Sequence, residues 1–479
     1  MNITNGKKIE RNNNMKNILV LSFLLLAFAS CKTTGEKSKQ TEKPPNLIVI
    51  MTDDMGYADV GFNGCLDIPT PAIDKIANQG VRFTQGYVSF PVCGPSRAGF
   101  LTGRYQDRFG FTTNASIDPN NPISGLPVDE ETMAQVLQKA GYKSAIVGKW
   151  HMGTHAVFHP LERGFDYFYG FLAGGHRYFP EELTLNSLSE VTSKWEWYNT
   201  KIIENRTPVE TDEYLTDELS NAAVKFITTQ VDDNQHFMLY LAYNAPHTPL
   251  QATEKYLARF PSIPEGKRKT YAAMVSAVDD GVERVLTALE EAGIDENTIV
   301  VFLSDNGGAS NNGSSNKPLR GLKGDLFEGG IRVPFAIRWK GVIPEGQTYE
   351  NPISSLDIMA TIVAQTDVKI NPLRPLDGEN LIPYLTGMNA GEPHDYLFWR
   401  KWEQNAMVVR HGSNKLVANR QQDQNPPELY NINSDGAETT NIKSSQKEVA
   451  DELLLEWQKW NAQMKDRVFP TLGEDEWWK

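Results

Sequence analysis

Four apolar runs rich in β-branched residues recur along the chain, and each has the length of a single strand. They cover residues 46–51, 144–147, 237–243 and 299–303. Runs of this kind are typical of strands that are buried on both faces of a parallel sheet. Two segments with apolar positions at helical spacing precede the second and fourth runs, at 132–140 and 271–289, and a glycine marks the end of each. The alternation predicts an α/β fold with a large, mostly parallel sheet flanked by helices.

Polar residues with useful chemistry follow each of the four runs. In chain order they are Asp53 and Asp54, Lys149 and His151, Asn244 and His247, and Asp305 and Asn306. Taken singly, each has an ordinary explanation as a turn or packing residue. Ligands of open α/β sheets bind beyond the carboxyl ends of the strands, so four such endings in four runs favour one shared site.

The acidic members of this set point to a metal. Asp53, Asp54, Asp305 and Asn306 offer only oxygen ligands. Such a set suits a hard cation such as calcium or magnesium, whereas a zinc site would need more nitrogen or sulfur. A cation there would bind and polarise an anionic group, which three carboxylates alone would repel.

A cysteine stands where the sequence predicts a helix to begin. Cys93 lies just before Pro95, which can occupy the first turn of a helix, and Arg97 is one turn further on. A helix N-terminus favours an anion and lowers the pKa of a thiol, so the pattern predicts a nucleophile at an oxyanion-binding site. Cysteine-dependent phosphatases place a longer spacer between Cys and Arg than the three residues found here. An inert buried cysteine would leave the adjacent Pro-Ser-Arg unexplained.

The N-terminal segment predicts export. Basic residues in 1–17 precede an apolar run over 18–29, which is shorter than the roughly 20 residues of a membrane span. The small residues before Cys31 resemble the lipobox of bacterial lipoproteins, in which the cysteine is lipidated; an ordinary signal peptide is the alternative. Residues 1–30 are thus interpreted as a signal peptide, and 31–45 as the lipidated cysteine with a solvated tether. The protein is expected in the periplasm or outer membrane, anchored only through lipid, with Met1 or Met15 as its start.

Composition narrows the class of protein. The 479 residues are 40% hydrophobic and 22% charged, which is typical of a soluble globular protein with one large domain and a smaller one. The formal net charge of −13 argues against nucleic acid as a partner. Three cysteines are too few and too scattered for a disulfide framework. Near residue 390 the pattern changes to short strands and a helix, so we expect a catalytic domain over 46–390 and a C-terminal subdomain over 391–479.

These motifs together resemble the type I sulfatases of the alkaline phosphatase superfamily. The most specific is Cys93-Gly-Pro-Ser-Arg97 followed by Leu101-Thr-Gly-Arg104. The supporting motifs occur in the family's order, from Asp53-Asp54-Met-Gly56 through Gly148-Lys-Trp-His151, Pro246-His247-Thr-Pro249 and Ser304-Asp-Asn-Gly307 to Leu319-Arg-Gly-Leu-Lys323. The resemblance implies the sulfatase fold, with a small antiparallel sheet and a helix at the C-terminus.

The resemblance also implies a mechanism. Cys93 would be oxidised to formylglycine by a formylglycine-generating or sulfatase-maturating enzyme, and the hydrated residue would join Asp53, Asp54, Asp305 and Asn306 as ligands of one calcium ion. One hydroxyl of the hydrate would attack sulfur, and loss of a proton from the second would release sulfate. His151 would be the base for that release. His247 and Lys323 would contact the leaving group. Arg97 and Lys149 would act as electrostatic clamps.

The substrate is inferred from location. An exported bacterial sulfatase is expected to act on sulfated polysaccharide fragments, such as the algal glycans ulvan and carrageenan or glycosaminoglycans. His176 and Arg177, with the loop that holds Trp195 and Trp197, lie between strands and could contact the sugar. The alternatives are a phosphodiesterase or phosphonate monoester hydrolase of the same superfamily, and a non-catalytic glycan-binding relative.

Overall fold

The structure is a computed structural model that describes residues 44–419, 426–472, 474 and 476–478. The predicted signal peptide, the lipidation of Cys31 and almost all of the tether lie outside these residues. The strands are β1 (Asn46–Thr52), β2 (Val81–Phe83), β3 (Gly86–Tyr87), β4 (Lys143–Lys149), β5 (Tyr167–Phe171), β6 (Ile202–Glu204), β7 (Thr207–Val209), β8 (Phe237–Ala242), β9 (Thr298–Ser304), β10 (Phe335–Arg338), β11 (Gln347–Tyr349), β12 (Ile353–Ser354), β13 (Leu397–Lys401), β14 (Ala406–His411), β15 (Asn414–Ala418) and β16 (Glu428–Asn431). The helices are α2 (Pro71–Asn78), α3 (Cys93–Thr102), α4 (Met133–Gln138), α5 (Leu215–Asp232), α6 (Glu254–Leu257), α7 (Lys267–Glu291), α8 (Glu328–Ile331), α9 (Asp357–Val363), α10 (Ile382–Leu385) and α11 (Lys447–Asn461).

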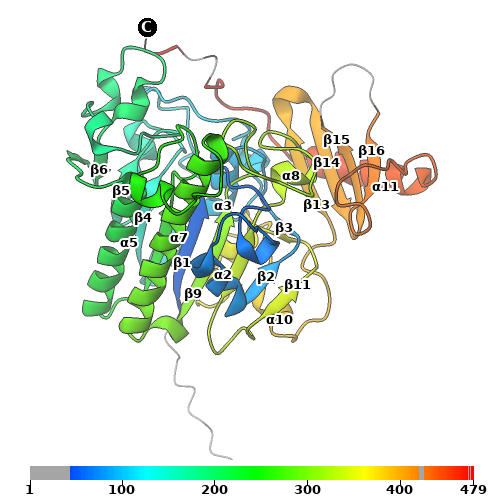
Figure 1. Ribbon diagram of the computed structural model, residues 1–479. Coiled ribbons are helices and arrows are strands. Elements are labelled where there is room, and N and C mark those ends of the chain that lie inside the picture. The colour runs from blue at the N-terminus through cyan, green and yellow to red at the C-terminus, as the bar shows by residue number, and fades with distance from the viewer. Residues whose placement is uncertain (1–43, 420–425, 473, 475, 479) are drawn as a thin grey trace, which may run out of the picture. The chain divides into compact units, whose positions relative to one another are not determined.

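A ten-stranded mixed sheet forms the centre of the structure (Figure 1). Its order is β11-β2-β10-β9-β1-β8-β4-β5-β6-β7. The central strands β9, β1, β8, β4 and β5 run parallel, whereas β10 and the pair β6 and β7 run antiparallel to their neighbours. The prediction of a large, mostly parallel sheet is therefore confirmed.

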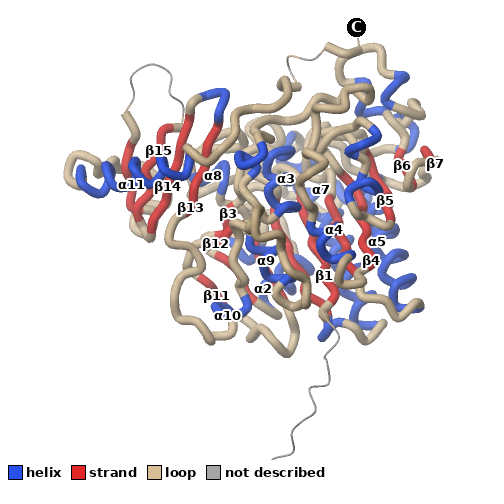
Figure 2. Tube along the Cα trace, turned by 180° about the vertical axis from the view of Figure 1, so that it is seen from behind, coloured by secondary structure: helices blue, strands red, loops and turns tan. Residues whose placement is uncertain are grey.

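Strand β1 is fully buried because helices cover both faces of the sheet. Ile48 and Ile50 pack into the core formed with α2, α5 and α7, whereas Leu47, Val49 and Met51 face the core formed with α3, α4 and α9. Figure 1 shows α5 and α7 over one face, and Figure 2 shows α4 and α9 over the other. Burial on both faces explains why the strand is apolar at every internal position.

The four-stranded sheet β13-β14-β15-β16 lies beside the large sheet (Figure 2). One of its faces packs against α11 through Met407 and Leu416, and the other packs through Trp399 against Tyr87 of β3 and Ile331 of α8. The predicted small antiparallel sheet with a helix is therefore confirmed.

The chain after α11 returns to segments around the large sheet. The backbone N–H of Lys465 donates to the carbonyl oxygen of Asp107 at 2.8 Å, and the ring centroids of Trp478 and Trp197 lie 5.6 Å apart. The C-terminal residues thus cover part of the loop that precedes β6. No helix in the described part of the chain has both the length and the apolar character needed to cross a membrane.

Candidate active site

Strand register brings the predicted polar residues to one edge of the sheet. Thr52 of β1 is in register with Ser304 of β9, so Asp53 and Asp305 leave the sheet side by side. Lys149 is the last residue of β4, which is separated from β1 only by β8. The backbone of Asp54 then takes a φ of 64°, a left-handed conformation that aspartate tolerates better than most residues.

The acidic residues form a buried cluster around Cys93. One possible ligand atom from each of Asp53, Asp54, Cys93 and Asp305 lies within 4.8 Å of the others. The side-chain nitrogen of Asn306 donates to Asp54 Oδ1 at 2.8 Å, and its buried Oδ1 has no hydrogen-bond partner among the described residues. A buried acceptor without a donor, beside three carboxylates, fits a bound hard cation.

Three basic side chains pair with these carboxylates. Lys149 Nζ lies 2.6 Å from Asp53 Oδ2, and Arg97 Nε and Nη2 lie 2.8 and 2.7 Å from Asp305 Oδ2. Lys323 Nζ lies 2.7 Å from Asp54 Oδ1 and 3.2 Å from Cys93 Sγ. The site is therefore close to electrically balanced despite the acidic chain.

These pairs act differently on two of the carboxylates. Burial tends to raise the pKa of Asp53, but Lys149 and the neighbouring cations outweigh it and hold that pKa below its usual range. Burial and the charge of Asp53 raise the pKa of Asp305 to about 6 despite the contact with Arg97. The pKa values of closely packed carboxylates commonly move apart in this way, because ionising one makes ionising the next more costly.

The thiol of Cys93 sits at the start of α3, as the sequence predicts, and is 1% exposed. Its pKa is raised, because burial and the charges of Asp305 and Asp53 outweigh Lys149 and Lys323. The prediction of a lowered thiol pKa is therefore wrong for the cysteine itself. Arg97, expected to favour a thiolate, has its guanidinium on Asp305 instead.

Both candidate proton-transfer residues are neutral imidazoles. Burial, aided by Lys149 and Arg97, lowers the pKa of His151 well below its usual range, and neither of its ring nitrogens has a hydrogen-bond partner among the described residues. Burial also lowers the pKa of His247. Its Nδ1 lies 2.6 Å from the carbonyl oxygen of Thr248, and its Nε2 lies 3.7 Å from Asp54 Oδ2.

Gly174 leaves the space that the His151 ring occupies. A Cβ atom at position 174 would lie 2.5 Å from His151 Nε2, closer than real contacts allow. We expect Gly174→Ala to lower kcat on an aryl sulfate on the order of 100-fold, because the imidazole must move away from the reacting group. Gly391→Ala is a suitable control, since a Cβ there would lie 3.3 Å from Asn389 Oδ1 in an exposed turn. Unchanged kcat in Gly174→Ala, with the fold confirmed by thermal denaturation, would argue against a role for His151.

The two predicted substrate contacts differ in the structure. His176 is fully buried, with Nδ1 and Nε2 at 2.8 and 2.6 Å from the carbonyl oxygens of Arg177 and Thr200. We therefore correct the expectation for His176: the ring supports its loop and does not face a substrate. The side chain of Arg177 is 38% exposed and lies 3.5 Å from Glu182, so it stays accessible.

Sequence reasoning missed two residues that hold the site. Arg97 Nη1 lies 3.3 Å from the hydroxyl oxygen of Tyr240, and the side-chain nitrogen of Asn312 donates to the carbonyl oxygen of Asp54 at 3.0 Å. A tyrosine within the apolar run of β8 is a signal that could have identified the first. Asn312 lies in a long loop without a periodic pattern and gave no signal.

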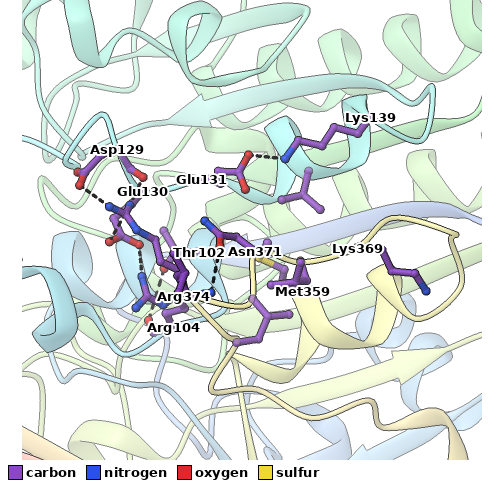
Figure 3. A pocket seen from close by; sticks show the side chains of 14 residues that line it. Thr102, Arg104, Asp129, Glu130, Glu131, Lys139, Met359, Lys369, Asn371 and Arg374 are labelled. Carbon is purple, nitrogen blue, oxygen red and sulfur yellow. Dashed lines mark hydrogen bonds and ion pairs between the residues drawn. The ribbon is translucent and has the colours of Figure 1, made fainter. Parts of the chain in front are cut away.

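A separate cavity of about 600 Å³ lies at the opposite end of α3 from Cys93 (Figure 3). Most of its charged side chains pair with one another: Arg104 contacts Glu130, and Arg374 Nη2 lies 2.7 Å from Asp129 Oδ2. Among the described residues of this lining, Lys369 is the charged side chain without an ion pair, so the cavity lacks the group of closely spaced carboxylates found around Cys93.

The chain is similar to known sulfatases over most of its length. A family model described as Sulfatase matches residues 45–368. N-acetylgalactosamine-6-sulfatase of Mus musculus is 36% identical over 368 residues, covering 74% of this chain and 69% of that protein. Uncharacterized sulfatase YdeN of Escherichia coli (strain K12) is 33% identical over 411 residues, covering 75% and 69%.

A solved structure agrees with the sequence matches. The crystal structure of Ps i-CgsB in complex with k-i-k-neocarrahexaose is 38% identical with a TM-score of 0.83, and covers 89% of this chain and 94% of that chain. Residues 45–368, which the family model matches, include the carboxylate cluster, Cys93 and the surrounding cations. The chain belongs to the sulfatase family and is a sulfuric ester hydrolase.

Proposed function

We propose that the protein removes sulfate from carrageenan-type oligosaccharides, using a calcium ion and a formylglycine derived from Cys93. The main support for this substrate class is the 38% identity to Ps i-CgsB, whose structure holds k-i-k-neocarrahexaose. The relative named N-acetylgalactosamine-6-sulfatase also supports a sulfated sugar as substrate. Glycosaminoglycans are therefore the main competing substrate class.

The oxygen cluster supports the choice of cation. Asp53, Asp54, Asp305 and Asn306 would hold calcium together with residue 93. Bound there, calcium would offset the charge of the carboxylates and of an incoming sulfate group. The hydrate of formylglycine would supply one hydroxyl for attack on sulfur and a second whose deprotonation releases sulfate.

The basic residues of the site differ in how deeply they are buried, and this distinguishes their roles. The side chains of Lys149 and Arg97 are 0% exposed and contact carboxylates of the cluster, so they orient residue 93 and its surroundings. Lys323 is 21% exposed and His247 12% exposed, which places them nearer to the entrance. These two would contact the leaving oxygen of the sugar, and the neutral ring of His151 would accept the proton lost during sulfate release.

Export and anchoring belong to the same proposal. The basic and apolar segments before Cys31 support export, followed by lipidation of that cysteine. A location in the periplasm or outer membrane would expose the enzyme to polysaccharide fragments. Conversion of Cys93 would require a formylglycine-generating or sulfatase-maturating enzyme in the same cell.

A substrate panel tests this proposal. We expect sulfate release from neocarrahexaose to exceed release from ulvan and chondroitin sulfate oligosaccharides by about tenfold or more in kcat/KM, because specificity follows contacts made in the transition state. An aryl sulfate and an aryl phosphate serve as small substrates, and the chelated enzyme should recover activity when calcium is restored. Faster hydrolysis of the phosphate ester would favour the phosphohydrolase alternative. Binding of every glycan without turnover would favour a non-catalytic relative.

A further inference from the structure

An exposed tryptophan is held in an unfavourable backbone conformation close to the active site. Trp195 has a φ of 74° and is 51% exposed. Bulky residues rarely adopt a left-handed conformation, and such outliers concentrate at functional sites. The Glu196 carboxylate stabilises the turn by accepting hydrogen bonds from the backbone N–H groups of Thr192 and Ser193, at 2.7 and 3.0 Å. The chain therefore fixes an apolar ring at the surface, where burial does not stabilise it.

Aromatic neighbours support this ring. The Trp195 and Tyr198 rings stack with centroids 5.8 Å apart and an interplanar angle of 18°. Trp197 lies 5.2 Å from Trp195, is itself 1% exposed, and packs against Trp478. The Nζ of Lys194 lies 5.1 Å from the Trp195 centroid. The turn thus presents a supported aromatic ring with the exposed, movable ammonium group of Lys194 over it.

Two glycines connect this turn to the catalytic residues. A Cβ atom at Gly175 would lie 2.3 Å from Tyr198 Cε1, and a Cβ atom at Gly174 would lie 2.5 Å from His151 Nε2. One short backbone segment therefore contacts the imidazole at one residue and the Tyr198 ring at the next.

Electrostatics agrees with this placement. Burial raises the pKa of Tyr198, and Lys323 and Asp53 also act on its hydroxyl. The hydroxyl therefore lies within the field of the catalytic cluster, whereas Trp195 lies further out toward solvent.

We propose that Lys194, Trp195 and Tyr198 form a subsite for a sugar ring adjacent to the one that loses its sulfate. Trp195 packs on the C–H face of this ring, Lys194 binds a second sulfate group on it, and the Tyr198 hydroxyl hydrogen-bonds the sugar nearer to the nucleophile. This inference rests on the proposed function, because it requires an oligosaccharide with more than one sulfate.

The acidic charge of the chain makes individual basic residues such as Lys194 important for binding a sulfated substrate. A net charge of −13 repels a sulfated polymer at long range, so attraction has to come from individual cations near the site. Arg177 supports the same rim, because its backbone N–H donates to the carbonyl oxygen of Tyr198 at 3.0 Å while its guanidinium is partly exposed. Glu182 lies 3.5 Å from that guanidinium, so Arg177 is partly neutralised and Lys194 is the stronger candidate.

Removal of the Trp195 ring tests the platform. Glycine accepts the left-handed φ at this position, so Trp195→Gly removes the ring without straining the turn. We expect kcat/KM on k-i-k-neocarrahexaose to fall by about tenfold or more, the equivalent of one buried aromatic contact. On 4-nitrophenyl sulfate, which has no second sugar ring for the subsite to bind, kcat/KM should change by less than about twofold. Trp195→Tyr keeps an aromatic face and should restore most of the loss.

A charge-matched pair tests Lys194. Lys194→Gln should weaken binding of the sulfated hexasaccharide, measured by calorimetry, but leave binding of its desulfated form unchanged. Lys143→Gln is the control, because Lys143 is also exposed but lies at the opposite end of β4 from Lys149. Equal losses on the hexasaccharide and the aryl sulfate in Trp195→Gly would overturn the subsite in favour of a structural role.

The same measurements separate the two proposals. If the wild-type enzyme hydrolyses the aryl sulfate but releases no sulfate from neocarrahexaose, the proposed function fails. The subsite is then judged by calorimetry with that hexasaccharide. Unchanged affinity in Trp195→Gly would overturn it, whereas a loss of about tenfold or more would support it.

Discussion

Replacing Cys93 by alanine is expected to abolish sulfate release while leaving the fold intact. Cys93 Sγ lies between Lys323 Nζ at 3.2 Å and Asp53 Oδ1 at 3.4 Å, at the centre of the carboxylate cluster. Loss of a nucleophile from a preorganised site lowers kcat on the order of a millionfold. Because alanine removes a single sulfur atom, we expect the free energy of unfolding to change by about 1 kcal/mol or less.

Sulfate release from an aryl sulfate and thermal unfolding measure the two parts of this expectation. Turnover near the wild-type rate in Cys93→Ala would disprove the proposed mechanism. Mass spectrometry of the tryptic peptide 83–97 is an independent check, since this peptide contains residue 93. Fully active enzyme with an unmodified thiol at this position would also contradict it.

Replacing Lys415 by methionine is expected to cause the largest loss of stability. The side chains of Lys415, Glu328 and Glu438 are all 0% exposed, and Lys415 Nζ lies 2.8 Å from a carboxylate oxygen of each glutamate. Methionine would leave two buried carboxylates without their shared cation. Breaking a buried pair in this way costs about 3 to 5 kcal/mol in the free energy of unfolding.

The loss should depend on pH. Burial raises the pKa of Glu438 to about 7, above its unfolded value, so stability linked to this group is present at low pH and lost as the pH rises toward 7. Without Lys415 the penalty for two charges grows, so the deficit of Lys415→Met should narrow as the pH falls from about 8 to 5. Urea denaturation at several pH values measures it.

Two further variants control this prediction. Lys459→Met removes an exposed lysine whose Nζ lies 2.6 Å from Glu456 Oε1, and should cost less than about 1 kcal/mol. Adding Glu438→Gln to Lys415→Met removes one of the two unpaired charges and should restore part of the stability. Equal stability of Lys415→Met and Lys459→Met would mean that the buried pair contributes nothing.

The central strands were predictable because each is buried on both faces. The apolar run 299–303 is one residue shorter than β9 at each end, and the run 46–51 is one residue shorter than β1 at its C-terminal end. The sheet edges were not predictable. Strands such as β7 and β11 have three residues and are partly exposed, so they lack an apolar run.

The site was predictable in its chemistry and less so in its contacts. Parallel strands ending at one edge explain why Asp53, Lys149 and Asp305 meet. No pattern in sequence indicates that Arg97 turns to Asp305 or that Trp478 packs on Trp197, because these contacts join segments far apart in the chain. The error for His176 has the same origin, since its partners are backbone carbonyls whose positions the sequence does not reveal.

The burial of Cys93 also limits when this residue can be modified. A second enzyme cannot reach the Cys93 side chain in the folded protein, because it is 1% exposed and lies behind Lys323 and the strand ends. If Cys93 is converted as proposed, the modification has to precede closure of the central sheet. Because β1 pairs with β8 and β9, whose residues lie 191 and 252 positions further along the chain, this closure is a slow, non-local step. The active fraction made in a cell would then reflect a race between folding and modification, and chains that fold first would stay inactive.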